Sequence, residues 1–172
     1  KALDDRVGCA VLMRCLEFLR ANRPDFTLVA NFAVSEEVGL RGARTAAHQI
    51  RPDMALVVEG TVGADTPGIP AHKCPARLGR GPAISVADSS IIVNPSLVTF
   101  MEEAAKKVNI PWQHKVPLFG GTDAGAIHLT GKGVLTGIVS VPCRYIHSPS
   151  SVLDLQDFEH TVSFVLELVR RA

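Results

Sequence analysis

The residues best suited to chemistry are carboxylates that follow strand-like segments. Glu36 and Glu37 follow the strand-like segment 26–34 after a single residue, Ser35, and Glu59 ends the run 54–60. In open α/β sheets, sites form where the loops at the carboxyl ends of the strands converge. Successive side chains of a strand point to opposite faces, so Glu36 and Glu37 either both lie in solvent or have two different roles.

Two further groups occupy comparable positions. Asp4 and Asp5 precede a helical pattern over 6–20, and His147 follows the apolar run 133–141. Taken alone, an acidic pair before a helix is most often a cap favoured by the helix dipole, and a single histidine is most often structural. Together, however, carboxylates and a histidine at successive strand ends are the ligand types that a divalent metal requires.

Helical and strand patterns alternate along the chain. The spacing of apolar residues predicts helices over 6–20, 40–50, 94–109, 123–130 and 154–171, and strands over 26–34, 54–60, 82–88, 112–118 and 133–141. Asn94 and Asp154 are expected to cap their helices, and Pro95 suits a first helical position. The glycine- and proline-rich stretch 60–81 predicts a loop with an edge strand. This alternation favours an α/β sandwich around a largely parallel or mixed sheet.

Composition excludes several classes of partner. Eighteen Lys and Arg balance 17 Asp and Glu in 172 residues, so nothing in the net charge favours binding to nucleic acid or to an anionic membrane. No apolar run approaches the roughly 18 residues of a membrane span, and no signal peptide is recognisable. The four cysteines show neither C-x-x-C nor zinc-finger spacing, so we expect reduced, buried thiols in a cytoplasmic protein.

Four stretches of the sequence resemble, in order and spacing, the second catalytic half of the M42 family of metallo-aminopeptidases, the glutamyl and tetrahedral aminopeptidase group. They are KALDDRVG, SEEVGLRGA, VVEGTVGADTPG and GGTDAGAIHLTGKGVLTGIVSVPCRYIHSP. The resemblance runs from Lys1 into the C-terminal helix. It implies a three-layer α/β sandwich with a mixed, largely parallel sheet, of the type found in co-catalytic zinc peptidases.

The resemblance also implies roles for individual residues around two divalent metal ions, zinc or cobalt. Asp4 would bridge the two metals, Glu37 and His147 would complete the first site, and Glu59 would bind the second. Glu36 would be the general base that takes a proton from the attacking water. Asp5 would support the site after an Asp4–Asp5 peptide bond that is cis in related enzymes.

The Gly-rich stretch 120–125 has two interpretations. It is not a phosphate-binding loop, because no Lys-Ser/Thr pair follows its glycines. It is either a tight turn into a helix that Asp123 caps or, as the resemblance implies, a wall of the substrate pocket formed by Gly121, Thr122 and Asp123. The implied substrate is a peptide, whose free amino terminus would bind at the second metal.

The chain also departs from the family pattern. An upstream H-x-D motif, whose histidine completes the second metal site, and an inserted β domain that serves oligomerisation would both precede Lys1. We therefore interpret residues 1–172 as the C-terminal part of the catalytic domain. We expect the isolated part to be impaired, and a homo-oligomer, a dodecamer by resemblance, for the whole protein.

Two alternatives to an aminopeptidase stay open. Paired carboxylates also serve glycoside hydrolases, and relatives have been labelled endoglucanases, although adjacent glutamates cannot by themselves flank a glycosidic bond and His147 would have no role. The second alternative is an inactive homologue that acts as an assembly subunit, which the absent upstream histidine favours.

Overall fold

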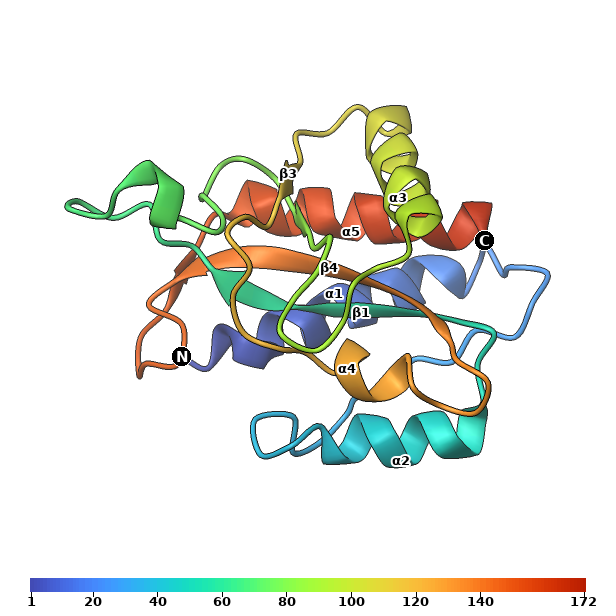
Figure 1. Cartoon of the computed structure of the whole chain (residues 1–172). Helices are drawn as coiled ribbons and strands as arrows, with labels where there is room; N and C mark the ends of the chain where they lie inside the picture. The colour runs from blue at the N-terminus through green and yellow to red at the C-terminus, as the bar shows by residue number, and fades with distance from the viewer.

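A computed structural model describes the whole chain, residues 1–172, as a sheet with helices on both faces (Figure 1). In chain order, the elements are α1 (Leu3–Leu19), α2 (Arg41–Ile50), β1 (Met54–Val62), the 3₁₀ turn η1 (Ala71–Lys73), β2 (Ala83–Ile84), α3 (Pro95–Lys107), β3 (Gln113–His114), α4 (Ala124–Ile127), β4 (Leu135–Arg144), β5 (Val152–Leu153) and α5 (Leu155–Arg171). None of the helices combines the length and the apolar composition that crossing a membrane requires.

The sheet is mixed, as the sequence predicted. Its order is β1-β4-β2-β3, and the short strand β5 pairs with β4. β1 and β4 run parallel from the pair Met54–Leu135 to the pair Val62–Cys143, whereas β2 is antiparallel to β4. In β4, eight successive residues are buried, which is typical of a strand covered on both faces.

The helices form two layers. α5 packs against both α1 and α3, and all three pack against the sheet, whereas α4 packs against both the sheet and α2. Under α1, Val11 and Cys15 meet Val141 of β4 and Val165 of α5. A second cluster joins α3, β2 and α5 through buried side chains that include Met101, Ile84 and Phe164. All four cysteines are free thiols, and three of them are buried.

The helix starts follow the sequence in two of three cases. The Asn94 side chain accepts the N–H of Ser96, Pro95 stands at the start of α3, and the Asp154 side chain accepts the N–H of Gln156 at the start of α5. Of the two interpretations of 120–125, the one in which Asp123 caps the helix is wrong, because its side chain makes no hydrogen bond to α4 (Ala124–Ile127).

Two strand predictions need correction. The segment 26–34 is not a strand, because no neighbouring strand lies within bonding distance to pair with its backbone. Its apolar side chains are consequently exposed, with Val29 at 50% and Val34 at 69%. The strand expected over 54–60 continues to Val62, so Glu59 lies inside β1, opposite Ser140, rather than at its end.

An ion pair links the end of β4 to the loop after β1, close to His147. The Arg144 guanidinium donates to both oxygens of Asp65, through Nε and Nη2 at 2.8 Å each, and the Leu78 N–H donates to the same carboxylate at 3.3 Å. The hydrogen bonds from Arg144 lower the pKa of Asp65 below its ordinary value of 3.8. The pair therefore stabilises the fold above that value, and its contribution is lost as the pH falls through the lowered pKa.

We expect Asp65→Asn to lower the urea midpoint of unfolding at pH 7. Protonation of Asp65 removes the same ion pair from the unmodified chain. The difference in urea midpoint between the unmodified chain and the variant should therefore narrow as the pH is lowered toward 3. Urea titrations between pH 7 and 3 measure it, with Asp53→Asn, an exposed aspartate without a partner, as the control. A difference of constant size at every pH would show that the ion pair does not contribute.

Candidate functional site

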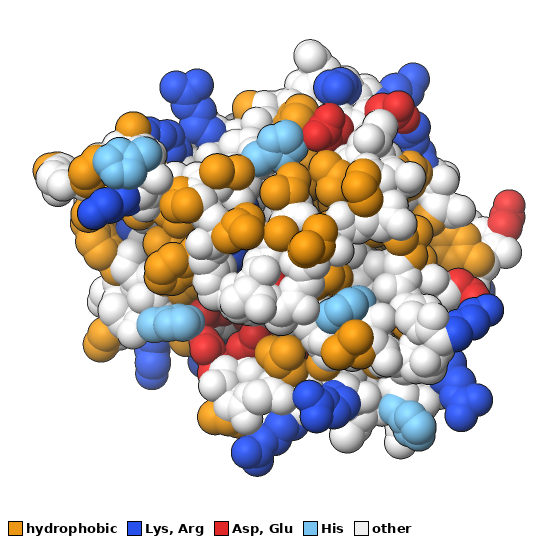
Figure 2. Space-filling model, in the orientation of Figure 1, with side chains coloured by type: hydrophobic (Ala, Val, Ile, Leu, Met, Phe, Trp, Pro, Cys, Tyr) orange, Lys and Arg blue, Asp and Glu red, His pale blue; other side chains and the backbone are white.

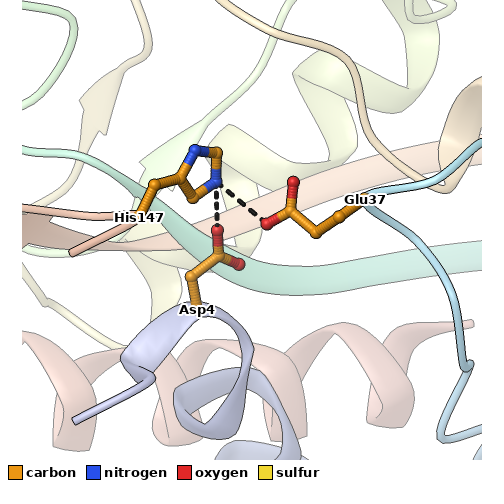
Figure 3. A group of neighbouring side chains, drawn as sticks. All are labelled: Asp4, Glu37 and His147. Carbon is orange, nitrogen blue, oxygen red and sulfur yellow. Dashed lines mark hydrogen bonds and ion pairs between the residues drawn. The ribbon is translucent and has the colours of Figure 1, made fainter. Parts of the chain in front are cut away.

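Three side chains that are far apart in the sequence converge on one point (Figure 3). His147 Nε2 lies 2.8 Å from Asp4 Oδ2 and 2.9 Å from Glu37 Oε1. One ligand atom from each of the three residues lies within 4.8 Å of the other two. We call Asp4, Glu37 and His147 the metal triad. Its side chains are unequally exposed, Asp4 at 19%, Glu37 at 60% and His147 at 63%, so one side of the triad faces solvent.

Each member of the triad is positioned by a different element. Asp4 lies at the start of α1, where its backbone and that of Asp5 are not yet helical. His147 lies just after β4, in a turn where its φ is +59°, and Ser35, just before the two glutamates, also has a φ of +59°. Side chains other than glycine adopt this left-handed conformation rarely, at a cost of about 1–3 kcal/mol that is typical of functional sites.

Asp5 connects the start of α1 to the sheet. Its Oδ1 accepts the N–H of Gly8, three residues along the helix, and the N–H of Gly60 in β1, both at 3.0 Å. Burial of the carboxylate raises the pKa of Asp5 to about 7, against the opposing effect of the hydrogen bond from Gly8. Asp5 thus holds the backbone that carries Asp4, and the Asp4–Asp5 peptide bond is cis, as the resemblance implied.

Glu36 and Glu37 lie in a turn, not in a strand, so the pleat of a strand does not set the directions of their side chains. The carbonyl of Glu36 accepts the N–H groups of Gly39 and Leu40 at 3.1 and 2.9 Å. Burial, followed by the charges of Glu37 and Asp123, raises the pKa of Glu36 to about 7. Glu36 is therefore a carboxyl group next to the triad, outside it, with a proton affinity suited to proton transfer near neutral pH.

Glu59 is close to the triad without being part of it. Its carboxylate accepts the Ser140 hydroxyl at 3.2 Å and lies 4.0 Å from the ammonium of Lys115. Burial raises the pKa of Glu59 well above its usual range, and the charge of Lys115 opposes this. The negative charges of Asp5 and Asp4 contribute to the same rise, so all three carboxyl groups share one electrostatic environment.

The Gly-rich stretch divides between support and site. Thr122 is fully buried. Its hydroxyl donates to Asp88 at 3.1 Å and accepts the N–H of Ala124, so this side chain stabilises the turn. Asp123 has a buried carboxylate oxygen without a hydrogen-bond partner, and burial raises its pKa. At Gly121, a Cβ would approach the Ser89 hydroxyl to 3.0 Å, so the backbone packs closely there.

One cavity of about 1660 Å³ brings the predicted site residues together. Eight of the nine line it, and Thr122 is the exception; the eight are Asp4, Asp5, Glu36, Glu37, Glu59, Gly121, Asp123 and His147. Figure 2 shows acidic side chains gathered in a hollow of one face, with a histidine beside them.

Sequence reasoning missed the residues that support the carboxylates. Lys115 belongs to the segment 112–118, for which the sequence predicts only a strand, and it is buried beside Glu59. No pattern within 112–118 indicates that Lys115 turns inward, since its contact with Glu59 depends on the parallel pairing of β2 with β3. The hydrogen bond from the Gly8 N–H to Asp5, in contrast, is the capping arrangement that an acidic pair before a helix favours.

The donor set fits a divalent metal. Two carboxylate oxygens and an imidazole nitrogen point at one another. The two carboxylates repel each other, so this arrangement is unfavourable unless a positive charge lies between them. Three protein ligands with an open side are the arrangement of catalytic zinc sites. Asp4, Glu37 and His147 would hold such an ion.

Solved structures of aminopeptidases share this architecture. An aminopeptidase of the archaeon Desulfurococcus kamchatkensis superposes with a TM-score of 0.91 at 39% identity, over 100% of this chain and 48% of its own. The Pyrococcus horikoshii TET1 peptidase, which can assemble into a tetrahedron or a large octahedral shell, superposes with a TM-score of 0.86 at 31% identity, over 100% and 49% of the two chains.

Sequence comparison leads to the same group of proteins. The glutamyl aminopeptidase of Lactococcus lactis subsp. cremoris is 34% identical over 98% of this chain and 46% of its own length. The chain spans about half the length of the curated relatives it matches. The family model for M42 glutamyl aminopeptidase matches residues 1–164, almost the whole chain. With the fold, the motifs and the relatives in agreement, the chain belongs to the M42 glutamyl aminopeptidase family.

Proposed function

We propose that the protein is a metal-dependent aminopeptidase that removes N-terminal residues from peptides. The observation that carries the proposal is the convergence of Asp4, Glu37 and His147 on one point, with Glu36 beside them in the same cavity. Membership of a family whose named relatives are aminopeptidases supports it.

The residues divide into ligands and a base. Asp4, Glu37 and His147 would hold the first of two divalent ions, zinc or cobalt, and Asp4 and Glu59 would hold the second. Such ions would supply the positive charge that acidifies a water molecule and polarises the peptide carbonyl. Ser140 and Lys115 hold Glu59 in place through one of its oxygens, Oε1, which leaves Oε2 available to a ligand.

Glu36 acts as the general base. Its carboxyl group takes a proton from the attacking water and then delivers it to the nitrogen of the leaving amine, so one side chain serves both halves of the hydrolysis. Asp5 keeps Asp4 in position through Gly8 and Gly60, and Gly121 and Asp123 form a wall of the substrate cavity.

The setting of the whole protein follows from its relatives. We infer a homo-oligomer, on the basis of the assembled TET1 peptidase of Pyrococcus horikoshii. A cytoplasmic location is consistent with four free thiols.

The glycoside hydrolase alternative accounts for less of the site. Such enzymes need two carboxyl groups roughly 5–9.5 Å apart across a bond, and they have no use for the contact of His147 with both Asp4 and Glu37. Hydrolysis of aminoacyl-anilides and of a β-glucan, each with and without a chelator, separates the two functions. Chelator-sensitive release of the anilide supports the aminopeptidase, whereas glucan cleavage that survives the chelator would contradict it. Loss of both activities in the complete, metal-loaded protein would indicate an inactive assembly subunit.

The chain itself should bind one zinc ion firmly and a second weakly. Three side chains and a water suffice for the first ion, whereas Asp4 and Glu59 alone are left for the second. His147→Gln should weaken binding of the first ion by at least about tenfold. Zinc content after dialysis and a calorimetric titration of the 172-residue chain measure both expectations.

His48→Gln is the matched control, because His48 is an exposed histidine of α2 with no hydrogen bond to the site. Two firmly held zinc ions per chain would mean that another residue replaces the upstream histidine, and His72 and His114 are the first to substitute in that case. Unchanged affinity in His147→Gln would remove the triad from the metal site.

The roles of the two adjacent glutamates can be separated in the complete protein. Glu36→Gln should keep the metal and lower kcat at least about 10²-fold, because only the proton acceptor is lost. Glu37→Gln, the same substitution one residue along, should lose metal. Metal analysis and kcat for both variants distinguish the roles, and near-normal turnover by both would contradict the assignment.

A further inference from the structure

The Gly-rich stretch packs against a short turn formed by residues 88–91. The Ser89 N–H donates to the carbonyl of Gly120 at 2.8 Å. A Cβ at Gly125 would lie only 2.5 Å from the Cβ of Ser90, so the two backbones can approach this closely only with glycine there. The turn and the stretch are therefore fitted to each other at both ends of the stretch.

The Asp88 side chain joins these two segments. It is 7% exposed, and a carboxylate buried to this extent needs hydrogen-bond donors. Its Oδ1 accepts the N–H and the hydroxyl of Ser90 at 2.7 Å each and the N–H of Ile91 at 3.1 Å. Its Oδ2 accepts the Thr122 hydroxyl at 3.1 Å. One oxygen thus fixes Asp88 within its own turn, and the other fixes the Gly-rich stretch.

The hydrogen bond to Thr122 reaches the cavity through Asp123. The Thr122 hydroxyl accepts the N–H of Ala124 at 3.2 Å, and the Thr122 carbonyl accepts the N–H of Gly125 at 2.9 Å. The backbone around Asp123 is therefore tied to Thr122. Asp123 itself lines the cavity, and one of its carboxylate oxygens is buried without a hydrogen-bond partner. The position of this side chain consequently depends on the backbone that carries it.

The Gly-rich stretch also contacts the turn that carries Glu36. A Cβ at Gly125 would lie 3.4 Å from Cδ1 of Leu40, and the Leu40 N–H donates to the Glu36 carbonyl at 2.9 Å. Glu36 and Asp123 both line the cavity. The position of the stretch therefore sets the distance between Asp123 and Glu36, and with it the width of this part of the cavity.

We propose that Asp88 is a positioning residue for substrate binding, which sets the place of Gly121 and Asp123 in the cavity wall through its hydrogen bond to Thr122. This inference rests on the proposed function, in which Gly121 and Asp123 form a wall of the substrate cavity. Asp88 does not line the cavity, so it acts on the substrate only through the Gly-rich stretch. Loss of the hydrogen bond changes the fit of the substrate and leaves the metal triad in place.

Asp88→Asn in the complete, metal-loaded protein tests the proposal. The amide oxygen keeps the hydrogen bonds within the turn, whereas the amide nitrogen cannot accept the Thr122 hydroxyl. Because a hydrogen bond to a charged group is lost, KM for an aminoacyl-anilide should rise at least about fivefold, with kcat within about twofold and metal content unchanged. The amides of Ala124 and Gly125 should exchange with deuterium at least about tenfold faster than in the unmodified protein.

Thr122→Val removes the same hydrogen bond from its other partner. If Asp88 acts through Thr122, the double variant should raise KM no more than the larger of the two single substitutions, because both remove one interaction. Additive increases in KM would show that the two residues act independently, and they would overturn the proposal.

Asp157→Asn is the matched control. Asp157 is 1% exposed and accepts the N–H groups of Gly79 and Gly81 at 2.7 Å each, but it does not line the cavity. This variant should lower the urea midpoint of unfolding, as Asp88→Asn does, and should leave KM unchanged. An unchanged KM in Asp88→Asn, an equal rise in both variants, or unchanged amide exchange in Asp88→Asn would overturn the proposal.

The amide exchange separates this inference from the proposed function. Absence of hydrolysis by the unmodified, metal-loaded protein would contradict the aminopeptidase. Faster exchange at Ala124 and Gly125 in Asp88→Asn alone would still show that Asp88 positions the stretch, and equal exchange in all variants would show that it does not.

Discussion

Repulsion among carboxylates that share one partly dry cavity is the constraint on which the site depends. Asp4, Asp5, Glu36 and Glu59 all have raised pKa values, with burial as the largest cause in each case. His147 and Lys115 are the basic side chains paired with members of this group. Clustered negative charge of this kind is costly unless a cation neutralises it, and the backbone of α1, the turn before α2 and the end of β4 are all arranged to maintain it.

The parts of this arrangement that follow from local rules could be predicted from the sequence. Strand and helix patterns located β1, β4 and the long helices, and the caps at Asn94 and Asp154 follow from the hydrogen-bonding capacity of those side chains. Of the metal triad, the general rule for parallel sheets places only His147, which follows β4. The grouping of His147 with Asp4 and Glu37 was implied by the resemblance to the family.

The parts that depend on partners distant in sequence could not be predicted. The segment 26–34 has the composition of a strand, but a strand exists only beside another strand, and composition cannot supply that neighbour. Glu36 and Glu37 lie in a turn closed by the Glu36 carbonyl, and not at the end of the strand that the preceding residues suggested. Lys115 turns inward because β3 pairs with β2, which no spacing within residues 112–118 reveals.

The unequal anchoring of the triad has a kinetic consequence. His147 follows the most deeply buried strand of the sheet, and Asp4 is tied to β1 through Asp5. Glu37, in contrast, lies in an exposed turn next to a segment with no backbone hydrogen bonds. Opening of that turn requires no disruption of the core, whereas displacement of Asp4 requires the loss of its link to β1. An ion held by the triad would thus enter and leave on the exposed side formed by Glu37 and His147, and the lifetime of the bound state would depend on the opening of the Glu37 turn.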